Sequence, residues 1–170
     1  MRRFLNALSL LACLLPAGLY AQDSLPQSLT FGYAFAGPVF VPRSGFTRWD
    51  GTFVHAGGGG EAGIGRYLSA GGEVGILAPL TNEFARTGGI LAGGISVHPR
   101  GPERHWDPFL SGGVGVLAGG GAAGLAYVGG GVHYWFRPRI GLRFEYRHHL
   151  WPNADGNIQL AGLRLGIALR

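Results

Sequence analysis

Apolar and polar residues alternate one by one along most of this sequence. From Ile140 to Arg147, Ile, Leu, Phe and Tyr occupy every second position, and Gly, Arg, Glu and Arg lie between them. Successive side chains of a β-strand point to opposite faces, so this segment predicts a strand with one apolar and one charged face. The segment from Gly129 to Phe136 and the Arg-Pro-Arg that follows it predict the partner strand and the turn of a hairpin.

Similar alternation recurs about every ten to fifteen residues, with Gly, Pro and Asp between the segments. Several short strands at such a spacing are typical of a β-barrel or a β-sandwich. We predict eight strands, at residues 28–36, 52–66 (interrupted by the glycines 57–60), 68–78, 86–98, 108–118, 124–136, 139–150 and 157–169. Residues 37–50 are expected to form a long loop on the outer side.

The charged residues of these predicted strands share one face with the glycines, and the apolar residues occupy the other face. A charge that faces lipid at mid-depth of a membrane costs about 2–4 kcal/mol, so the charged face should point inward. The sequence therefore predicts an all-β fold, an eight-stranded antiparallel up-and-down transmembrane β-barrel. Six residues are expected to form a structural ion-pair network inside it: Glu61, Glu73, Arg143, Glu145, Arg147 and Arg164.

The first residues have the pattern of a secretory signal peptide. Arg2 and Arg3 precede an apolar stretch at 4–16 and a small-residue zone at 17–21. We expect cleavage after Ala21, which divides the chain into a signal peptide (1–21) and a barrel domain (22–170). The only cysteine, Cys13, lies in this leader, so no disulfide is expected in the mature protein; lipidation of Cys13 is the alternative. No later apolar run reaches the roughly 18 residues of a membrane helix, so any membrane span must consist of strands.

Charge and composition exclude several classes of function. The formal charge is +5 and all of the positive charge is arginine, but no arginine cluster with interleaved aromatic residues suggests nucleic-acid binding. His148, His149 and Asp155 could be offered as metal ligands, yet adjacent histidines on a strand point in opposite directions. Gly113-x-Gly115-x-x-Ala118 lacks the helix of a dinucleotide site. We therefore expect no metal and no cofactor.

Two stretches resemble OmpA-like outer-membrane β-barrel proteins. One is the hairpin from Gly129 to Arg147, with its Gly-rich strand, its aromatic-x-Pro turn and its Glu-Tyr-Arg ending; the other is Asp107-Pro-Phe-Leu-Ser-Gly-Gly-Val-Gly115. The resemblance implies a small eight-stranded barrel in the outer membrane. Members of that family usually end in an aromatic residue, whereas this sequence ends in Ala168-Leu169-Arg170.

Residues 147–157 are similar, more faintly, to the end of lipid A deacylase barrels, where a histidine and a nearby serine hydrolyse an acyl ester. That chemistry needs a nucleophile within hydrogen-bond reach of a base. Leu150 and Trp151 stand where the serine is expected, so Ser96 or Ser111 would have to approach through folding. The other interpretation places His148, His149 and Trp151 at the membrane interface, where amphipathic rings are favoured. His133 is expected to be an interior polar group.

The leading hypothesis is a structural or interaction protein of the outer membrane, without catalytic activity and with a filled interior. We expect a monomer that contacts outer-membrane lipid and binds no nucleic acid; the residues do not identify a further partner. One alternative is a lipid A deacylase-like barrel that has lost or relocated its serine. The other is a soluble secreted lipocalin-like carrier, which would turn the two faces inside out.

Overall fold

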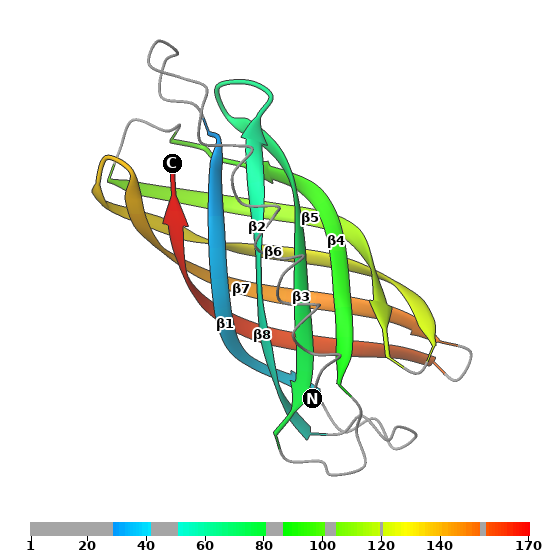
Figure 1. Ribbon diagram of the computed structural model, residues 1–170. Coiled ribbons are helices and arrows are strands. Elements are labelled where there is room, and N and C mark those ends of the chain that lie inside the picture. Colours follow the sequence, from blue (N-terminus) through cyan, green and yellow to red (C-terminus); the bar gives the residue numbers. More distant parts are fainter. Residues whose placement is uncertain (1–28, 42–50, 81–86, 101–104, 120, 154–155) are drawn as a thin grey trace, which may run out of the picture.

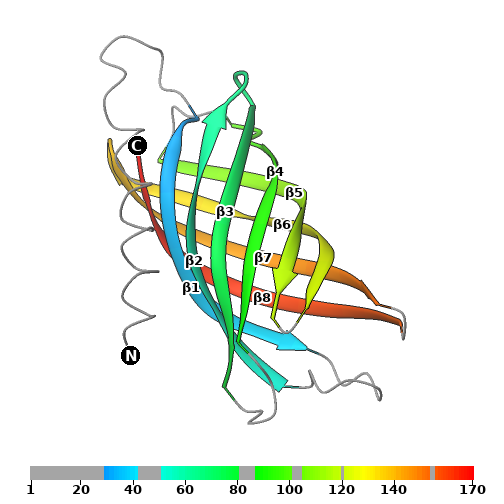
Figure 2. The ribbon, with the colours of Figure 1, turned by 45° about the vertical axis from the view of Figure 1, so that its right-hand side comes forward.

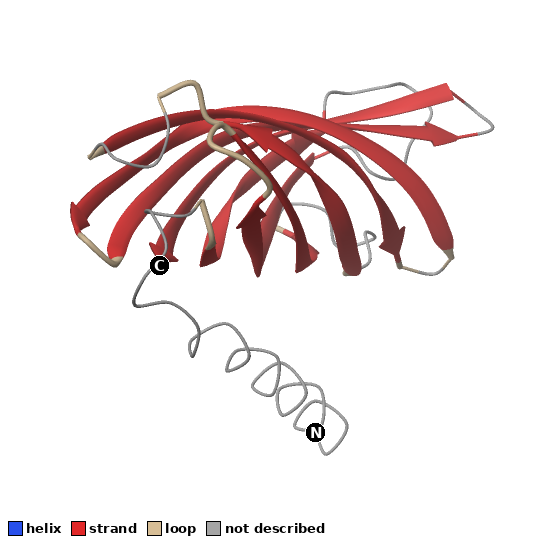
Figure 3. Cartoon of the chain, turned by 90° about the horizontal axis from the view of Figure 1, so that it is seen from above, coloured by secondary structure: helices blue, strands red, loops and turns tan. Residues whose placement is uncertain are grey.

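The computed structural model describes residues 29–41, 51–80, 87–100, 105–119, 121–153 and 156–170. The described chain consists of strands joined by turns and loops (Figure 3). None of its elements is a helix long and apolar enough to cross a membrane. The predicted signal peptide lies outside the described residues.

The predicted all-β fold is confirmed, with eight strands in chain order. Their bounds are β1 Phe31–Val41, β2 Gly51–Gly63, β3 Leu68–Pro79, β4 Gly88–Val97, β5 Trp106–Ala118, β6 Ala122–Arg137, β7 Ile140–Asn153 and β8 Gly156–Leu169. Each strand pairs antiparallel with the next one in the sequence, and β8 pairs with β1, which closes the barrel. Strands β1 to β4 run along one wall, and β5 to β8 cross behind them at a steep angle (Figures 1 and 2). Such tilt is what closure of a sheet into a barrel requires.

The two ends of the barrel differ in what they contain. Strand β1 begins beside the end of β8, since Gly32 pairs with Leu169. We call this the terminal end; it also holds the turns at 64–67, 98–105 and 138–139. The opposite loop end holds the connections at 42–50, 80–87, 119–121 and 154–155. Both termini of the barrel therefore lie on one side, as an even number of antiparallel strands requires.

The first strand is longer than predicted, and this expectation was wrong. Residues Gly37 to Val41, assigned to the loop at 37–50, continue β1 instead. Pro38 suggested a break because proline cannot donate to a strand ladder. In the structure it still lies opposite Val54 of β2, while the pairing of β1 with β8 skips from Ala36 to Val39. The four glycines at 57–60 likewise do not interrupt β2.

Apart from Arg137 at the end of β6, the eight described strands carry no exposed aspartate, glutamate or arginine. Their outward face is lined by aliphatic and aromatic side chains that are about half exposed or more, such as Leu91 at 61% and Val114 at 68%. Phe144 and Tyr146 of β7 are 48% and 50% exposed. The expected orientation of this hairpin is therefore confirmed.

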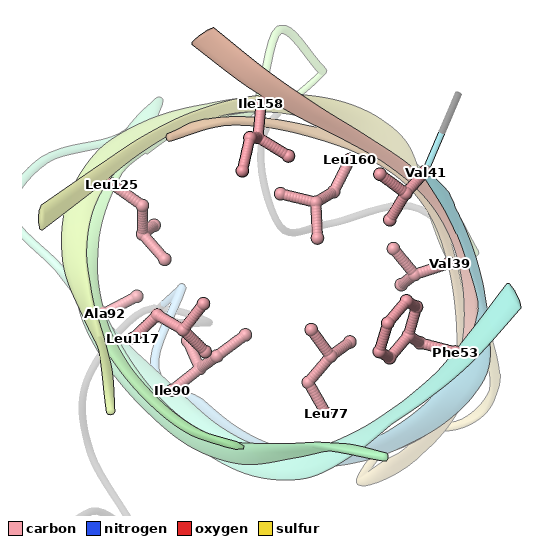
Figure 4. Close-up of a cluster of buried hydrophobic side chains, with 10 residues drawn as sticks. All are labelled: Val39, Val41, Phe53, Leu77, Ile90, Ala92, Leu117, Leu125, Ile158 and Leu160. Carbon is pink, nitrogen blue, oxygen red and sulfur yellow. The ribbon is translucent and has the colours of Figure 1, made fainter. Parts of the chain in front are cut away.

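The interior is not uniformly polar, which corrects the expectation that the apolar residues gather on the outer face. Near the loop end, apolar side chains from around the wall point toward the barrel axis (Figure 4). They form one buried cluster: Val39, Val41, Phe53, Leu77, Ile90, Ala92, Leu117, Leu125, Ile158 and Leu160. The predicted alternation fails here because both faces are apolar; Ile90 points inward and its neighbour Leu91 points outward.

Glycine lets neighbouring strands approach one another closely on the inner face. A Cβ atom at Gly131 would lie 2.0 Å from the carbonyl oxygen of Phe144 and 2.9 Å from the ring of Phe109. At Gly59 it would meet the backbone of Gly72 at 2.4 Å and the side chain of Glu73 at 2.8 Å. Glycine at these inward positions is thus required by the close packing of neighbouring strands, and it leaves room for the long charged side chains beside it.

Replacing Gly131 with alanine is expected to destabilise the barrel, because the new methyl group overlaps the backbone of β7. The expected loss is about 1–3 kcal/mol, as for other overpacked interiors. Gly124→Ala in the same strand is the matched control, since nothing lies within 4 Å of its added Cβ. Urea unfolding in detergent micelles measures both; equal stability of the two variants would contradict the steric explanation.

Candidate functional site

The six charged residues singled out from the sequence lie together inside the barrel. Arg147 pairs with Glu73 at 2.6 Å and with Glu145 at 2.7 Å. Arg164 reaches the same two carboxylates at 3.0 and 3.3 Å. Arg143 pairs with Glu61 at 2.9 Å and with Glu145 at 3.2 Å. Glu145 is therefore the common partner of all three arginines, and the six groups form one connected network.

Strand register explains why these residues meet. Glu145 of β7 lies directly opposite Arg164 of β8, and Glu61 and Glu73 point inward from β2 and β3 across the barrel. All six side chains are buried; Arg143 and Arg147 are each 1% exposed. Water cannot screen such charges, so each one requires a partner within hydrogen-bond distance.

Aromatic rings cover the flat faces of the three guanidinium groups. Arg143 lies between Tyr33 and Phe109, with both ring centroids 4.3 Å from its Cζ atom. Tyr127 stacks on Arg147 at 4.1 Å, and Phe35 on Arg164 at 3.3 Å. Arginine suits this position because a planar fork can stack on a ring while its edge donates to carboxylates.

A second polar layer adjoins the network toward the terminal end. His98, directly after β4, contacts Asp107 of β5 through Nδ1 at 3.0 and 3.1 Å. Its Nε2 atom lies 3.1 Å from the hydroxyl of Ser69, which is itself 2.5 Å from Glu61. His133 of β6 lies 3.5 Å from Asp107 and is buried, as expected from the sequence.

Ser69, His98 and Asp107 follow the order of a hydrolase triad, but the protons are placed differently. A triad histidine must accept the serine proton through Nε2. Here the Ser69 hydroxyl donates to Glu61, so Nε2 of His98 donates to the Ser69 oxygen. Burial would lower the pKa of His98, yet its contacts with Asp107 and Glu61 outweigh burial and raise that pKa to about 9. His98 is then an imidazolium and cannot act as the base.

His98, Asp107 and His133 also lie close enough to suggest a metal site, with one candidate atom each within 4.8 Å of the others. Nε2 of His133 lies 3.0 Å from Nη1 of Arg143. A guanidinium can only donate, so Nε2 accepts and the proton of a neutral His133 sits on Nδ1. Nδ1 is the atom that would have to bind the metal. This proton arrangement favours a hydrogen-bonded cluster over a metal centre.

The histidines near the end of β7 do not form a site together. His149 points into the barrel and is 3% exposed, whereas His148 lies on the outward face of the same strand. Ser111 is buried in β5, but neither its hydroxyl nor Nε2 of His149 has a hydrogen-bond partner. Ser96 lies opposite Ser111 in β4 and has no described bond to either histidine. Asp155 lies outside the described residues.

Sequence reasoning did not single out Ser69, His98 or Asp107, although a signal for them was present. Ser69 shares strand parity with Glu73, and His98 shares it with Ser96 at the end of the neighbouring strand. The predicted strands at 68–78 and 86–98 include both residues, and Ser69 was already expected on the same face as Glu73; neither residue was assigned a role there. Which partner each one meets depends on strand stagger, which the sequence does not display.

No protein-family model matches the sequence, and no curated protein matches it either. Among solved structures, Neisserial surface protein A is similar with a TM-score of 0.67 and 13% identity, over 82% of this chain and 96% of that one. The N-terminal β-barrel domain of Pseudomonas aeruginosa OprF follows with a TM-score of 0.60 and 15% identity, over 84% and 100%. The outer membrane protein OprG of Pseudomonas aeruginosa matches with a TM-score of 0.53 and 8% identity, over 84% and 96%. The chain therefore has the fold of small outer-membrane β-barrels.

Neutralising Glu145 should destabilise the barrel strongly. Glu145→Gln keeps the shape of the side chain but leaves three buried guanidinium groups with only two network carboxylates. Breaking a buried ion pair typically costs about 3–5 kcal/mol. The double variant Glu145→Gln/Arg143→Met restores the charge balance. Its loss of unfolding free energy should be smaller than the sum of the losses in the two single variants. Unfolding in micelles measures the stability of the natural protein and the three variants. Additive losses of stability would argue against a coupled network.

His98 should make stability depend on pH above neutrality. Because its pKa is raised in the folded state, its contribution is complete below pH 6.5 and is lost as the pH rises through about 9. A pKa shift of that size corresponds to a contribution of at most about 3 kcal/mol to the free energy of unfolding. The unfolding free energy of the natural protein should therefore fall between pH 7 and 9.5, and that of His98→Gln should stay level. Parallel curves for the two proteins would refute the assignment.

Proposed function

We propose that this chain is a structural or interaction protein of the bacterial outer membrane, in which the barrel spans the bilayer as a closed, non-catalytic element. The observation that carries the proposal is the division of charge between the two faces. Apart from Arg137 at the very end of β6, no described strand exposes Asp, Glu or Arg, while three arginines and four acids are buried inside. A lipid environment favours this division because a charged side chain that faces lipid costs free energy, whereas one that faces the barrel interior can be paired.

The solved structures with this fold support the same location. Their descriptions name a surface protein, an outer membrane protein and a β-barrel domain. Both ends of the described chain lie at one end of the barrel, which suits a protein that enters the outer membrane from the periplasm. We accordingly place the terminal end in the periplasm and the loop end outside the cell.

The interior packing supports a closed barrel. Near the loop end, a hollow lined by His55, Leu77 and Trp151 measures about 10 Å³, which is room for about one water molecule. Below it the ion pairs and their stacked rings cross the barrel. An eight-stranded barrel is only just wide enough for its own side chains, so no continuous aqueous path is expected.

Hydrolysis is not favoured by the buried polar groups. The Ser69 hydroxyl is 0% exposed and gives its proton to Glu61. The histidine and serine that a deacylase-like reaction would use, His149 and Ser111, do not bond to one another. A soluble carrier is disfavoured as well, because Leu163, Leu165 and Ile167 would all face water at more than 50% exposure.

Fluorescence quenching in liposomes tests whether the apolar face meets lipid. One protein carries Phe144→Trp as its only tryptophan, and a matched protein keeps only Trp135, which points inward and is 3% exposed. Lipids with brominated chains should quench the tryptophan at position 144 strongly and Trp135 weakly. A protein that stays in the aqueous phase, or equal quenching at the two positions, would overturn the membrane-spanning assignment.

The same reconstituted preparation tests whether the barrel is closed. In planar bilayers it should insert without producing conductance steps, because the apolar cluster and the ion pairs leave no water-filled path. Phe53→Ala/Leu77→Ala, which removes two buried members of that cluster, should produce larger fluctuations. Regular conductance steps from the unmodified protein would remove the closed-barrel part of the proposal and leave the membrane part standing.

A further inference from the structure

In the described part of the chain, the arginines that the interior does not use gather at the terminal end of the barrel. Arg66 lies in the turn between β2 and β3, Arg100 in the connection between β4 and β5, and Arg137 and Arg139 flank the turn between β6 and β7. All four are exposed. Arg170 directly follows β8 at the same end. Every turn at this end therefore carries at least one arginine, and we call the four exposed residues Arg66, Arg100, Arg137 and Arg139 the arginine collar.

The collar has no acidic counterpart among the described surface residues. Each described acid of the chain is buried in the barrel: Glu61, Glu73, Asp107 and Glu145. No ion pair joins Arg66, Arg100, Arg137 or Arg139 to another residue in the described part of the chain. Within the residues that the structure describes, the collar thus presents positive charge without an acidic partner, on side chains that can each donate several hydrogen bonds.

The collar is held in place by the backbone. The amide of Arg170 donates to the carbonyl of Arg139 at 3.0 Å, which ties the end of β8 to the turn before β7. The amide of His98 donates to the carbonyl of Tyr67 at 2.8 Å, which ties the connection after β4 to the turn before β3. These hydrogen bonds fix the backbone of the arginine-bearing turns to neighbouring segments of the rim.

Aromatic residues mark the level of the membrane at which the collar lies. Tyr67, Trp106 and Phe136 are exposed by 45%, 53% and 47% at the terminal ends of their strands. The Trp106 ring lies 4.5 Å from that of Tyr134 on the next strand. Such aromatic girdles sit at the boundary between hydrocarbon and headgroups. Arg66 and Arg137 are sequence neighbours of this girdle, and their side chains can extend from it to the phosphate level.

We propose that the arginine collar binds anionic phospholipid headgroups of the periplasmic leaflet. Phosphate fits because the guanidinium fork offers paired, charge-assisted hydrogen bonds to its oxygens. Lipid is the favoured source because the collar surrounds the rim beside the girdle, where headgroups necessarily contact it. An acidic periplasmic protein or polymer would instead be expected to use a single face. The inference rests on the proposed membrane location and adds a lipid preference to it.

Energy transfer from tryptophan to labelled lipid tests the collar. The protein is placed in phosphatidylcholine liposomes that contain a small share of dansyl-labelled phosphatidylglycerol or, in parallel, dansyl-labelled phosphatidylcholine. The signal from Trp106 is obtained by subtracting that of Trp106→Phe. Because a basic residue at a membrane surface is worth about a fivefold preference for anionic lipid, transfer to phosphatidylglycerol should be several-fold higher. The difference should vanish in about 1 M salt, where the charges are screened.

Two triple variants separate the collar from net charge. Arg66→Gln/Arg137→Gln/Arg139→Gln should abolish the preference, whereas Arg43→Gln/Arg48→Gln/Arg86→Gln removes the same charge from connections of the loop end and should keep it. An unchanged preference in the first variant, or equal loss in both, overturns the inference. Insertion is checked by faster gel migration before boiling than after it. Failure to insert overturns the proposed function as well, while insertion without lipid preference overturns the collar alone.

Discussion

Buried charges in a closed barrel have to cancel one another, and the rest of this structure is arranged around that constraint. The three network arginines and the His98 imidazolium face Glu61, Glu73, Glu145 and Asp107, so the described interior is electrically neutral. The cancellation is distributed, because Glu145 serves three arginines and Glu61 serves both Arg143 and Ser69. Removing one member leaves several others without a partner, which couples strands far apart in the sequence.

Neutrality alone does not fit these groups into so narrow a space. The guanidinium groups of the three arginines stack on aromatic rings of β1, β5 and β6, so their planar faces serve as packing surfaces. Glycines on the same inward face let the strands approach closely, and because they have no side chain they leave space for the arginines. Toward the loop end no acid or arginine of the described residues points inward, and apolar side chains occupy the interior instead. The barrel thus has an ionic half and an apolar half, with His55 and His149 between them.

Much of this could be predicted from strand parity. The number of strands, their order and the inward direction of the six network residues follow from alternation, because a charge at an outward position would face lipid. Parity failed where both faces are apolar, so the cluster around Phe53 and Leu77 was not foreseen. It also failed at Pro38, where β1 continues past the proline in an unchanged register with β8 that lacks only the pairs at residues 37 and 38. The partners of Ser69 and His98 depend on stagger between strands, which no local pattern encodes.

The separation of charge in this chain has a consequence for its surface. The described interior is neutral, and among the described strands only the last residue of β6, Arg137, is an exposed charge, so the net positive charge of the protein has to lie at its two ends. In the described chain all exposed arginines are at the terminal end, beside an aromatic girdle. A barrel that neutralises its interior with equal numbers of opposite charges has no structural use for these additional cations. Their position beside the aromatic girdle is what the proposed binding of anionic lipid headgroups would explain.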